Sequence, residues 1–348
     1  MGLFGGGKKA KKEAVKERIA QYPKPHKVKA YSDTWKSDLE RALFDADVNA
    51  VMALYRPLDV IARYYLIQDF SDAFSRPAPV GPELANRWAE RLQGSEDPYE
   101  KMLLGVMHNG IGWAIRGDGT ANTVSPEQRL DFRGHLRGGL NLLLSAGLDL
   151  KNTDIVPYLH AQNSAFALES GNPTDVSQHW QSIDPFNRIG LETLGFQLDE
   201  RWFGDFQSQL GLVRWIAQNA PEGSDGLAAV PAIILDRWVY LTDFVGMDED
   251  DADAEVFEDD DYIAVLDLAY NKLFNSGDAV DPRTEARHLN YFAFCFYWGG
   301  EDEKAWEIFK RLEGRCYEHV WEHRDDDEGG LQAFEDALKY LVEEVELA

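Results

Sequence analysis

From Trp35 onward, apolar residues recur at helical spacing, and no segment has the strict alternation of a half-buried strand. The N-termini of several helices can also be recognised from capping residues in the sequence. Asp97–Glu100 and Ser125–Gln128 are both capping boxes with proline at the first helical position. The pattern predicts an all-α fold over residues 31–348, built from antiparallel helix pairs joined by short turns.

The helix that follows Asp97 is expected to end at Arg116 and Gly117. Its glycines, Gly105, Gly110 and Gly112, weaken an isolated helix but let a neighbouring helix approach closely. Similar start and stop signals predict the remaining helices. We expect them at about residues 126–147, 157–171, from 185, 206–220, 227–244, 262–275, 282–298, 302–323 and 331–345.

Residues 286–319 match the 34-residue pattern of a tetratricopeptide repeat. Small residues, Ala293 and Ala305, stand where two helices must approach, Gly300 stands in the turn, and Phe309 is the large apolar residue that packs between them. A weaker copy has the same spacings at Ser164, Gly171, Val176 and Trp180. Together they predict a tetratricopeptide-like α-solenoid of stacked helix pairs.

A further pattern within residues 90–245 consists of Trp113–Gly119 with Thr123 and Val124, Asp184–Pro185, Trp202–Phe206 and Ala220–Ser224. In these residues the chain resembles an uncharacterised bacterial, actinobacterial-type family described as tetratricopeptide-like. The resemblance implies a helical fold and no established activity. The chain departs from the family at Phe203, where members have a second glycine, and at Asp205, where they have serine.

Charge is distributed unevenly along the chain. Residues 1–29 hold nine Lys/Arg and two Glu, a net of +7, which leaves −33 for the rest of a chain whose net charge is −26. So acidic a body repels the phosphates of nucleic acid and attracts cationic proteins or peptides. We expect residues 1–30 to be a flexible basic arm and 246–261 an acidic, solvated loop.

The compartment is inferred from what the sequence lacks. The two cysteines, Cys295 and Cys316, stand in apolar helical patterns and suggest no disulfide framework. No apolar stretch approaches the roughly 20 residues needed to span a bilayer. We therefore expect a cytoplasmic protein without a transmembrane segment. One alternative is a peripheral membrane protein whose basic arm docks on anionic lipid.

His319, Glu322 and His323 form an H-x-x-E-H motif. On one helix the two histidines would share a face and could hold zinc, with Glu322 as general base, so a zinc-dependent hydrolase is a second alternative. Such a site needs a third ligand, for which only Glu335 and Glu343 are plausible downstream. We favour a structural role for the motif and expect no metal, cofactor or catalytic residue.

Four residues are candidates for partner binding: Trp113, Arg116, Trp202 and Arg214. Tryptophan and arginine are favoured at binding hot spots, and the four could line one concave groove. The competing interpretation places both tryptophans in the core and pairs the arginines with surplus acid. The function that we predict is a scaffold or adaptor that binds a protein or peptide without catalysis. The sequence does not identify the partner, the pathway or the oligomeric state.

Overall fold

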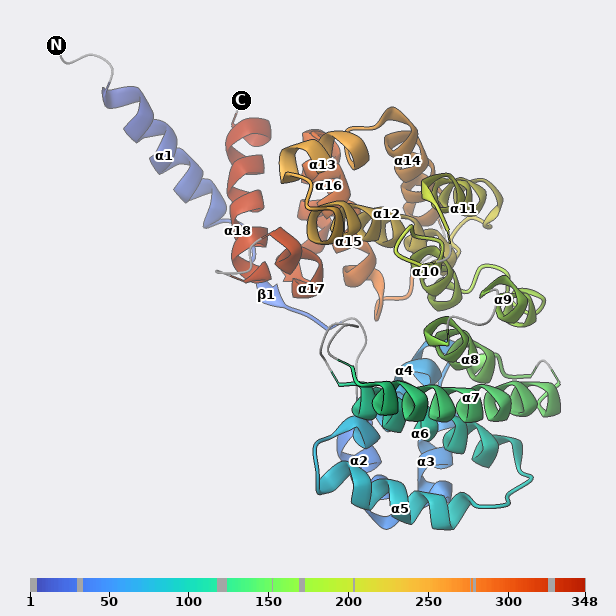
Figure 1. The fold of residues 1–348 in the computed structure, drawn as a ribbon. Coiled ribbons are helices and arrows are strands. Elements are labelled where there is room, and N and C mark those ends of the chain that lie inside the picture. Colours follow the sequence, from blue (N-terminus) through green and yellow to red (C-terminus); the bar gives the residue numbers. More distant parts are fainter. Residues whose placement is uncertain are drawn as a thin grey trace. The chain divides into compact units, whose positions relative to one another are not determined.

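The computed structural model describes residues 5–29, 34–117, 124–151, 153–168, 173–202, 204–275, 277, 280–324 and 329–347. Regular structure in these ranges is almost entirely helical, which confirms the all-α prediction (Figure 1). Two short strands, β1 (His26–Lys27) and β2 (Arg315–Cys316), pair in parallel, with His26 opposite Arg315. No helix in the described ranges is long and apolar enough to cross a bilayer.

The chain forms two compact units rather than the single domain predicted over residues 31–348. Unit 1 comprises Met1–Ser32 and Leu198–Ala348, and unit 2 comprises Asp33–Gln197. The predicted boundary at residue 30 is close to the end of the first segment of unit 1. What the sequence pattern did not indicate is that this segment belongs with the C-terminal half of the chain.

Unit 2 is built around α6 and α7, whose starts follow the predicted capping. The Asp97 side chain accepts hydrogen bonds from the backbone N–H groups of Tyr99 and Glu100, and Ser125 and Gln128 cap each other reciprocally. The elements of the unit are α2 (Lys36–Asp45), α3 (Val48–Tyr55), α4 (Val60–Asp72), the 3-10 turn η1 (Ala73–Ser75), α5 (Val80–Leu92), α6 (Pro98–Arg116), α7 (Pro126–Asp149), α8 (Val156–Ala167), α9 (Pro173–Gln181) and α10 (Arg188–Gln197).

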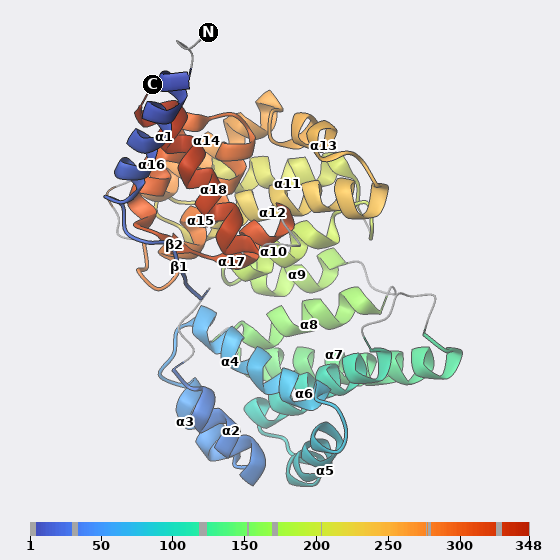
Figure 2. The same ribbon diagram turned by 90° about the vertical axis from the view of Figure 1, so that its left-hand side faces the viewer.

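Glycine allows α6 and α7 to approach each other closely. A Cβ atom at Gly139 would lie 2.8 Å from the carbonyl oxygen of Gly105, closer than such atoms can come. The prediction of close helix approach at Gly105 is therefore confirmed. The opposite side of α6 packs against α4 and α5, and α8 covers α7 (Figure 2).

Unit 1 has an aromatic core around α15, whose residues from Ala286 to Phe296 are all buried. Phe309 packs against the rings of Trp321 and Phe334. The elements of the unit are α1 (Gly5–Ile19), β1, α11 (Phe206–Asn219), the 3-10 turn η3 (Asp225–Ala228), α12 (Ala229–Val239), the π-helical turn η4 (Tyr240–Val245), α13 (Glu249–Val256), α14 (Asp260–Phe274), α15 (Glu285–Trp298), α16 (Asp302–Leu312), β2, α17 (Glu318–Trp321), the 3-10 turn η5 (Glu322–Arg324), α18 (Gly330–Leu341) and the π-helical turn η6 (Val342–Glu346).

The helix pair α15 and α16 has the small residues where the repeat pattern requires them. Ala293 and Ala305 are fully buried, and Gly300 adopts a φ of 70° in the turn between the helices. In the weaker copy, Ser164, Val176 and Trp180 are buried, while Gly171 lies outside the described residues. The burial of these positions fits a pair of helices in which small residues of one helix face large residues of the other. A regular stack of such repeats stays a prediction.

The predicted helix over residues 302–323 is wrong beyond Leu312. Glu313 and Gly314 adopt left-handed φ values of 51° and 80°, which end α16. A Cβ atom at Gly314 would lie 2.8 Å from the carbonyl oxygen of Lys24, so glycine also lets β1 approach. The chain then forms β2 before α17 begins.

The prediction of an acidic loop over residues 246–261 is wrong for Glu249–Val256, which form the helix α13. The Asp248 side chain caps this helix by accepting a hydrogen bond from the backbone N–H of Asp250. Acidic residues in a first turn complement the helix dipole, which favours helix over loop here. The inner face is anchored by buried Ala252 and Val256 and by Asp253, which accepts a 2.8 Å hydrogen bond from the Trp238 indole.

The predicted flexible arm contains a helix, α1, which runs along α18 (Figures 1 and 2). Lys11 forms ion pairs of 3.1 and 3.2 Å with Glu343 and Glu344, and Arg18 pairs with Glu346. The basic segment thus meets acidic residues of η6, an attraction that the charge count of each segment alone did not reveal.

Candidate functional site

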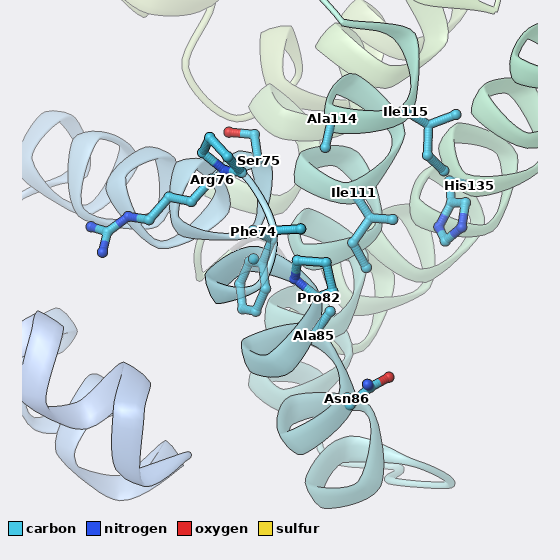
Figure 3. Close-up of a pocket in the computed structure, with 13 residues that line it drawn as sticks. Phe74, Ser75, Arg76, Pro82, Ala85, Asn86, Ile111, Ala114, Ile115 and His135 are labelled. Atoms are coloured by element: carbon cyan, nitrogen blue, oxygen red, sulfur yellow. The ribbon is translucent and has the colours of Figure 1, made fainter.

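An open groove of about 520 Å³ lies in unit 2 (Figure 3). Its lining comes from three places: the turn after η1 together with the start of α5, the C-terminal half of α6, and His135 of α7. The volume falls within the roughly 300–1,000 Å³ of known ligand sites. We refer to it as the α5–α6 groove.

The first wall is a compact turn between η1 and α5. Arg76 is extended, Ala78–Pro79 is a cis peptide, and α5 begins at Val80. A Cβ atom at Gly81 would lie 2.3 Å from the carbonyl oxygen of Arg76. Glycine there lets the first turn of α5 sit directly against the preceding backbone.

The second wall is one face of α6. Ile111, Ala114 and Ile115 are three and four residues apart, so their side chains project from the same side of the helix. Close packing holds this face in place, because a Cβ atom at Gly110 would lie 2.2 Å from the Ser71 carbonyl oxygen. This confirms the close approach predicted at Gly110. By contrast, a Cβ atom at Gly112 would make only ordinary contacts of 3.5 Å.

The lining is backed by buried aromatic side chains that meet edge to face. Phe74 is buried in the wall, with its ring 5.0 Å from that of Phe70, which in turn meets Trp88 edge to face at 4.8 Å. The indole of Trp88 donates a 2.9 Å hydrogen bond to the carbonyl oxygen of Leu43. Aromatic rings fixed in this way give the groove a rigid apolar support.

Polar side chains are confined to the edges of the α5–α6 groove. Arg76 extends away from Ile111 and Ala114 of α6 in Figure 3 and lies 3.4 Å from the carboxylate of Glu40 in α2. Asn86 is exposed at the periphery. The middle of the groove, around Pro82, Ala85 and Ile111, therefore suits apolar side chains of a ligand.

His135 at the groove is paired with His108, their Nδ1 atoms 3.0 Å apart. Burial lowers the pKa of both imidazoles, and the neighbouring His135 lowers that of His108 further. Asp131 acts in the opposite direction on His135. Both rings are therefore neutral at pH 7, with one nitrogen donating and the other accepting.

Of the predicted partner-binding residues, Trp113 and Arg116 lie together on α6. Trp113 is 42% exposed and packs edge to face on Phe132, so it is not a core residue. The Arg116 guanidinium lies 5.4 Å from the centre of the Trp113 ring and donates to the Gly117 carbonyl oxygen. The pair adjoins Ala114 in sequence, but neither residue lines the groove.

The other two predicted residues belong to unit 1. Trp202 is 45% exposed, and Arg214 pairs with Asp261 at 2.5 Å, as the competing interpretation proposed for the arginines. Neither unit contains all four residues, so the predicted single groove is not a feature of either one. The sequence lacked this information because helical spacing relates residues within one helix only.

The H-x-x-E-H motif does not occupy one continuous helix. His319 is in the four-residue α17, and His323 is in the 3-10 turn η5, with the two rings 5.5 Å apart. Across the described ranges, no group of three or more His, Cys, Asp and Glu side chains is placed to hold a metal ion. The helical geometry on which the zinc interpretation depended is thus interrupted.

Sequence reasoning missed the α5–α6 groove. A signal was present in the closely spaced Pro77, Pro79, Gly81 and Pro82, which mark an irregular turn between helices. The three sides of the groove nevertheless meet only through tertiary packing.

Comparison with known proteins adds no relative, since no protein-family model, no curated protein and no solved structure matches this chain.

Proposed function

We propose that this chain is a non-catalytic binding protein that takes up a short segment of a protein or peptide in the α5–α6 groove. The observation that carries the proposal is the lining: apolar side chains fill the middle, and polar ones stand at the edges. Apolar contacts would supply the affinity, and the polar edge would orient the segment.

The Trp113–Arg116 pair extends the proposed surface along α6. An exposed tryptophan beside a stacked arginine is a combination typical of binding hot spots. Trp113 directly precedes Ala114, and the two side chains project about 100° apart around the helix. A segment that leaves the groove across the C-terminal turn of α6 would therefore reach the indole.

The proposal can be tested by filling the groove without disturbing the core. Ala114 is exposed on the groove wall, so Ala114→Arg places a long side chain in the binding space. Ala89→Arg is the matched control, because Ala89 is exposed on α5 and does not line the groove. Arginine and alanine both favour helix, so neither change should unfold the protein.

Peptides selected from a displayed random library on the full-length chain would serve as probes, with affinity measured by fluorescence anisotropy. We expect Ala114→Arg to weaken their binding by about tenfold or more, the effect of losing a hot-spot contact. Ala89→Arg should leave the affinity within about twofold. Equal binding by both variants, or no enriched peptide, would contradict the proposal.

A further inference from the structure

Unit 1 presents an exposed apolar pair on the π-helical turn η4. Phe244 is 65% and Val245 is 53% exposed at the C-terminal end of this turn. Gly246 follows with a φ of 75° and reverses the chain toward α13. Large apolar residues that stand out side by side cost solvation free energy, which a docked partner would recover. Short π-helical turns also occur frequently at functional sites.

Phe244 packs on a buried arginine, Arg201, whose charge is neutralised by two aspartates. The Arg201 guanidinium lies 5.0 Å from the centre of the Phe244 ring and 5.6 Å from that of Tyr240. Its side chain is almost fully buried and forms ion pairs with Asp199 at 2.8 Å and Asp236 at 2.7 Å. Because this support is already neutralised, it leaves no positive charge to oppose a cationic partner.

Acidic residues stand close to the apolar pair along the chain. Asp243 precedes Phe244, and α13, which packs against η4, carries Asp250 and Asp251 in its first turn. All three are exposed, and none of them forms an ion pair with another described residue. Their neighbours Glu249 and Asp253 are different, because both bind Arg324.

From this combination we infer that the η4–α13 surface, defined by Asp243, Phe244, Val245, Asp250 and Asp251, docks a basic amphipathic helix of a partner protein. Apolar residues on one face of that helix cover Phe244 and Val245, and flanking Lys or Arg side chains face the three exposed carboxylates that form no ion pair with another described residue. The inference is independent of the α5–α6 groove, which lies in unit 2.

The probe is a synthetic peptide of about 18 residues, five helical turns, with leucine along one face and lysine elsewhere. Its counterpart has glutamate in place of every lysine. We expect the lysine peptide to bind the full-length chain saturably, and more weakly as salt is raised, because exposed charges are screened. The glutamate peptide should not bind.

Two surface variants assign the binding to this site. Phe244→Ser with Val245→Ser removes the apolar pair, and Asp250→Lys with Asp251→Lys reverses the adjacent charge. Each should weaken binding of the lysine peptide by about tenfold. Lysine in the first turn of α13 opposes the helix dipole, so circular dichroism must show that this variant keeps its helix content. Phe244→Ser with Val245→Ser leaves α13 unchanged and decides the inference if the lysine variant loses helix.

Matched controls lie elsewhere in unit 1. Leu268→Ser changes another exposed apolar residue, and Glu222→Lys with Glu303→Lys changes two exposed carboxylates. Both should bind the peptide within about twofold of the parent protein, as should Ala114→Arg in the groove. Equal affinities in all variants, an equal loss in the controls, or equal binding of the glutamate peptide would each overturn the inference.

Discussion

The Nδ1 atoms of His108 and His135 lie 3.0 Å apart, across the contact between α6 and α7 beside the α5–α6 groove. Two protonated imidazoles at this separation would repel each other, and burial already lowers the pKa of both. A histidine with a folded-state pKa below its unfolded value binds protons more readily when unfolded. The contribution of these two neutral imidazoles to the free energy of unfolding is therefore fully present above about pH 6.5. It is lost as the pH falls below that value.

His160 makes this pH dependence measurable. Burial lowers its pKa from the ordinary 6.5 to about 3, and its ring stacks on Tyr64. The linkage relation gives a loss of about 2 kcal/mol in unfolding free energy between pH 7.5 and pH 5 from this residue alone. Urea titrations at the two pH values measure it. His160→Asn should reduce the difference, and an unchanged difference in this variant would contradict the burial of the His160 imidazole.

Two helical glycines should respond oppositely to alanine. A Cβ atom at Gly110 would lie 2.2 Å from the Ser71 carbonyl oxygen, so Gly110→Ala should destabilise unit 2 by about 1–3 kcal/mol through overpacking. Gly134 in α7 has open space around it, so Gly134→Ala should stabilise by about 0.5–1 kcal/mol. Chemical denaturation of both variants tests the pair, and a loss of stability in both would contradict the glycine packing described here.

Phe309→Ala should destabilise the protein by about 3–5 kcal/mol, the usual cost of emptying a buried aromatic site. Phe309 is 3% exposed, with its ring 4.7 Å from that of Phe334. Denaturation of the variant by urea gives the value. A loss under about 1 kcal/mol would mean that the neighbouring rings do not depend on this side chain.

The purified protein should contain no stoichiometric zinc, since the helix expected at H-x-x-E-H breaks between His319 and His323. Elemental analysis after expression in zinc-supplemented medium is the measurement. One zinc per chain, lost in His319→Ala, would revive the hydrolase hypothesis and would mean that this segment rearranges to bind the metal.

Salt should loosen α1. Its described ion pairs with η6 join Lys11 to Glu343 and Glu344, and Arg18 to Glu346, all partly exposed. Hydrogen exchange of residues 11–22 should therefore quicken at about 1 M salt, where the Debye length falls to roughly 3 Å. Glu346→Lys should have the same effect at low salt, and Glu303→Lys should not. If neither salt nor Glu346→Lys changes the hydrogen-exchange rates, apolar contacts and not ion pairs hold α1 in place.

Local signals predicted the helices that begin with strong caps. Ser125 caps α7 as predicted, and Asp205 caps α11 in the same way, because a short polar side chain that satisfies free N–H groups acts within a few residues. Pro231 falls inside the predicted helix 227–244. In the structure it lies in the first turn of α12, where its missing N–H group costs little.

What the sequence did not predict depends on partners far along the chain. The acidic run that forms α13 becomes helical where Trp238 and Arg324 bind Asp253, and neither partner is adjacent in sequence. The α5–α6 groove likewise needs Gly110 of α6 to fit the carbonyl group of Ser71 in α4. Of the candidate site, the sequence identified the exposed Trp113–Arg116 pair but not the groove beside it.

The pairing of β1 with β2 has a consequence for biosynthesis. When His26 leaves the ribosome, its partner Arg315 has not been made, and at about 5–20 residues per second it follows roughly 15–60 s later. Unit 2 is continuous in sequence, so all its parts are available first. During that interval the nascent N-terminal segment, with its lysines, has no acidic C-terminal partner, and polyanionic surfaces can compete for it.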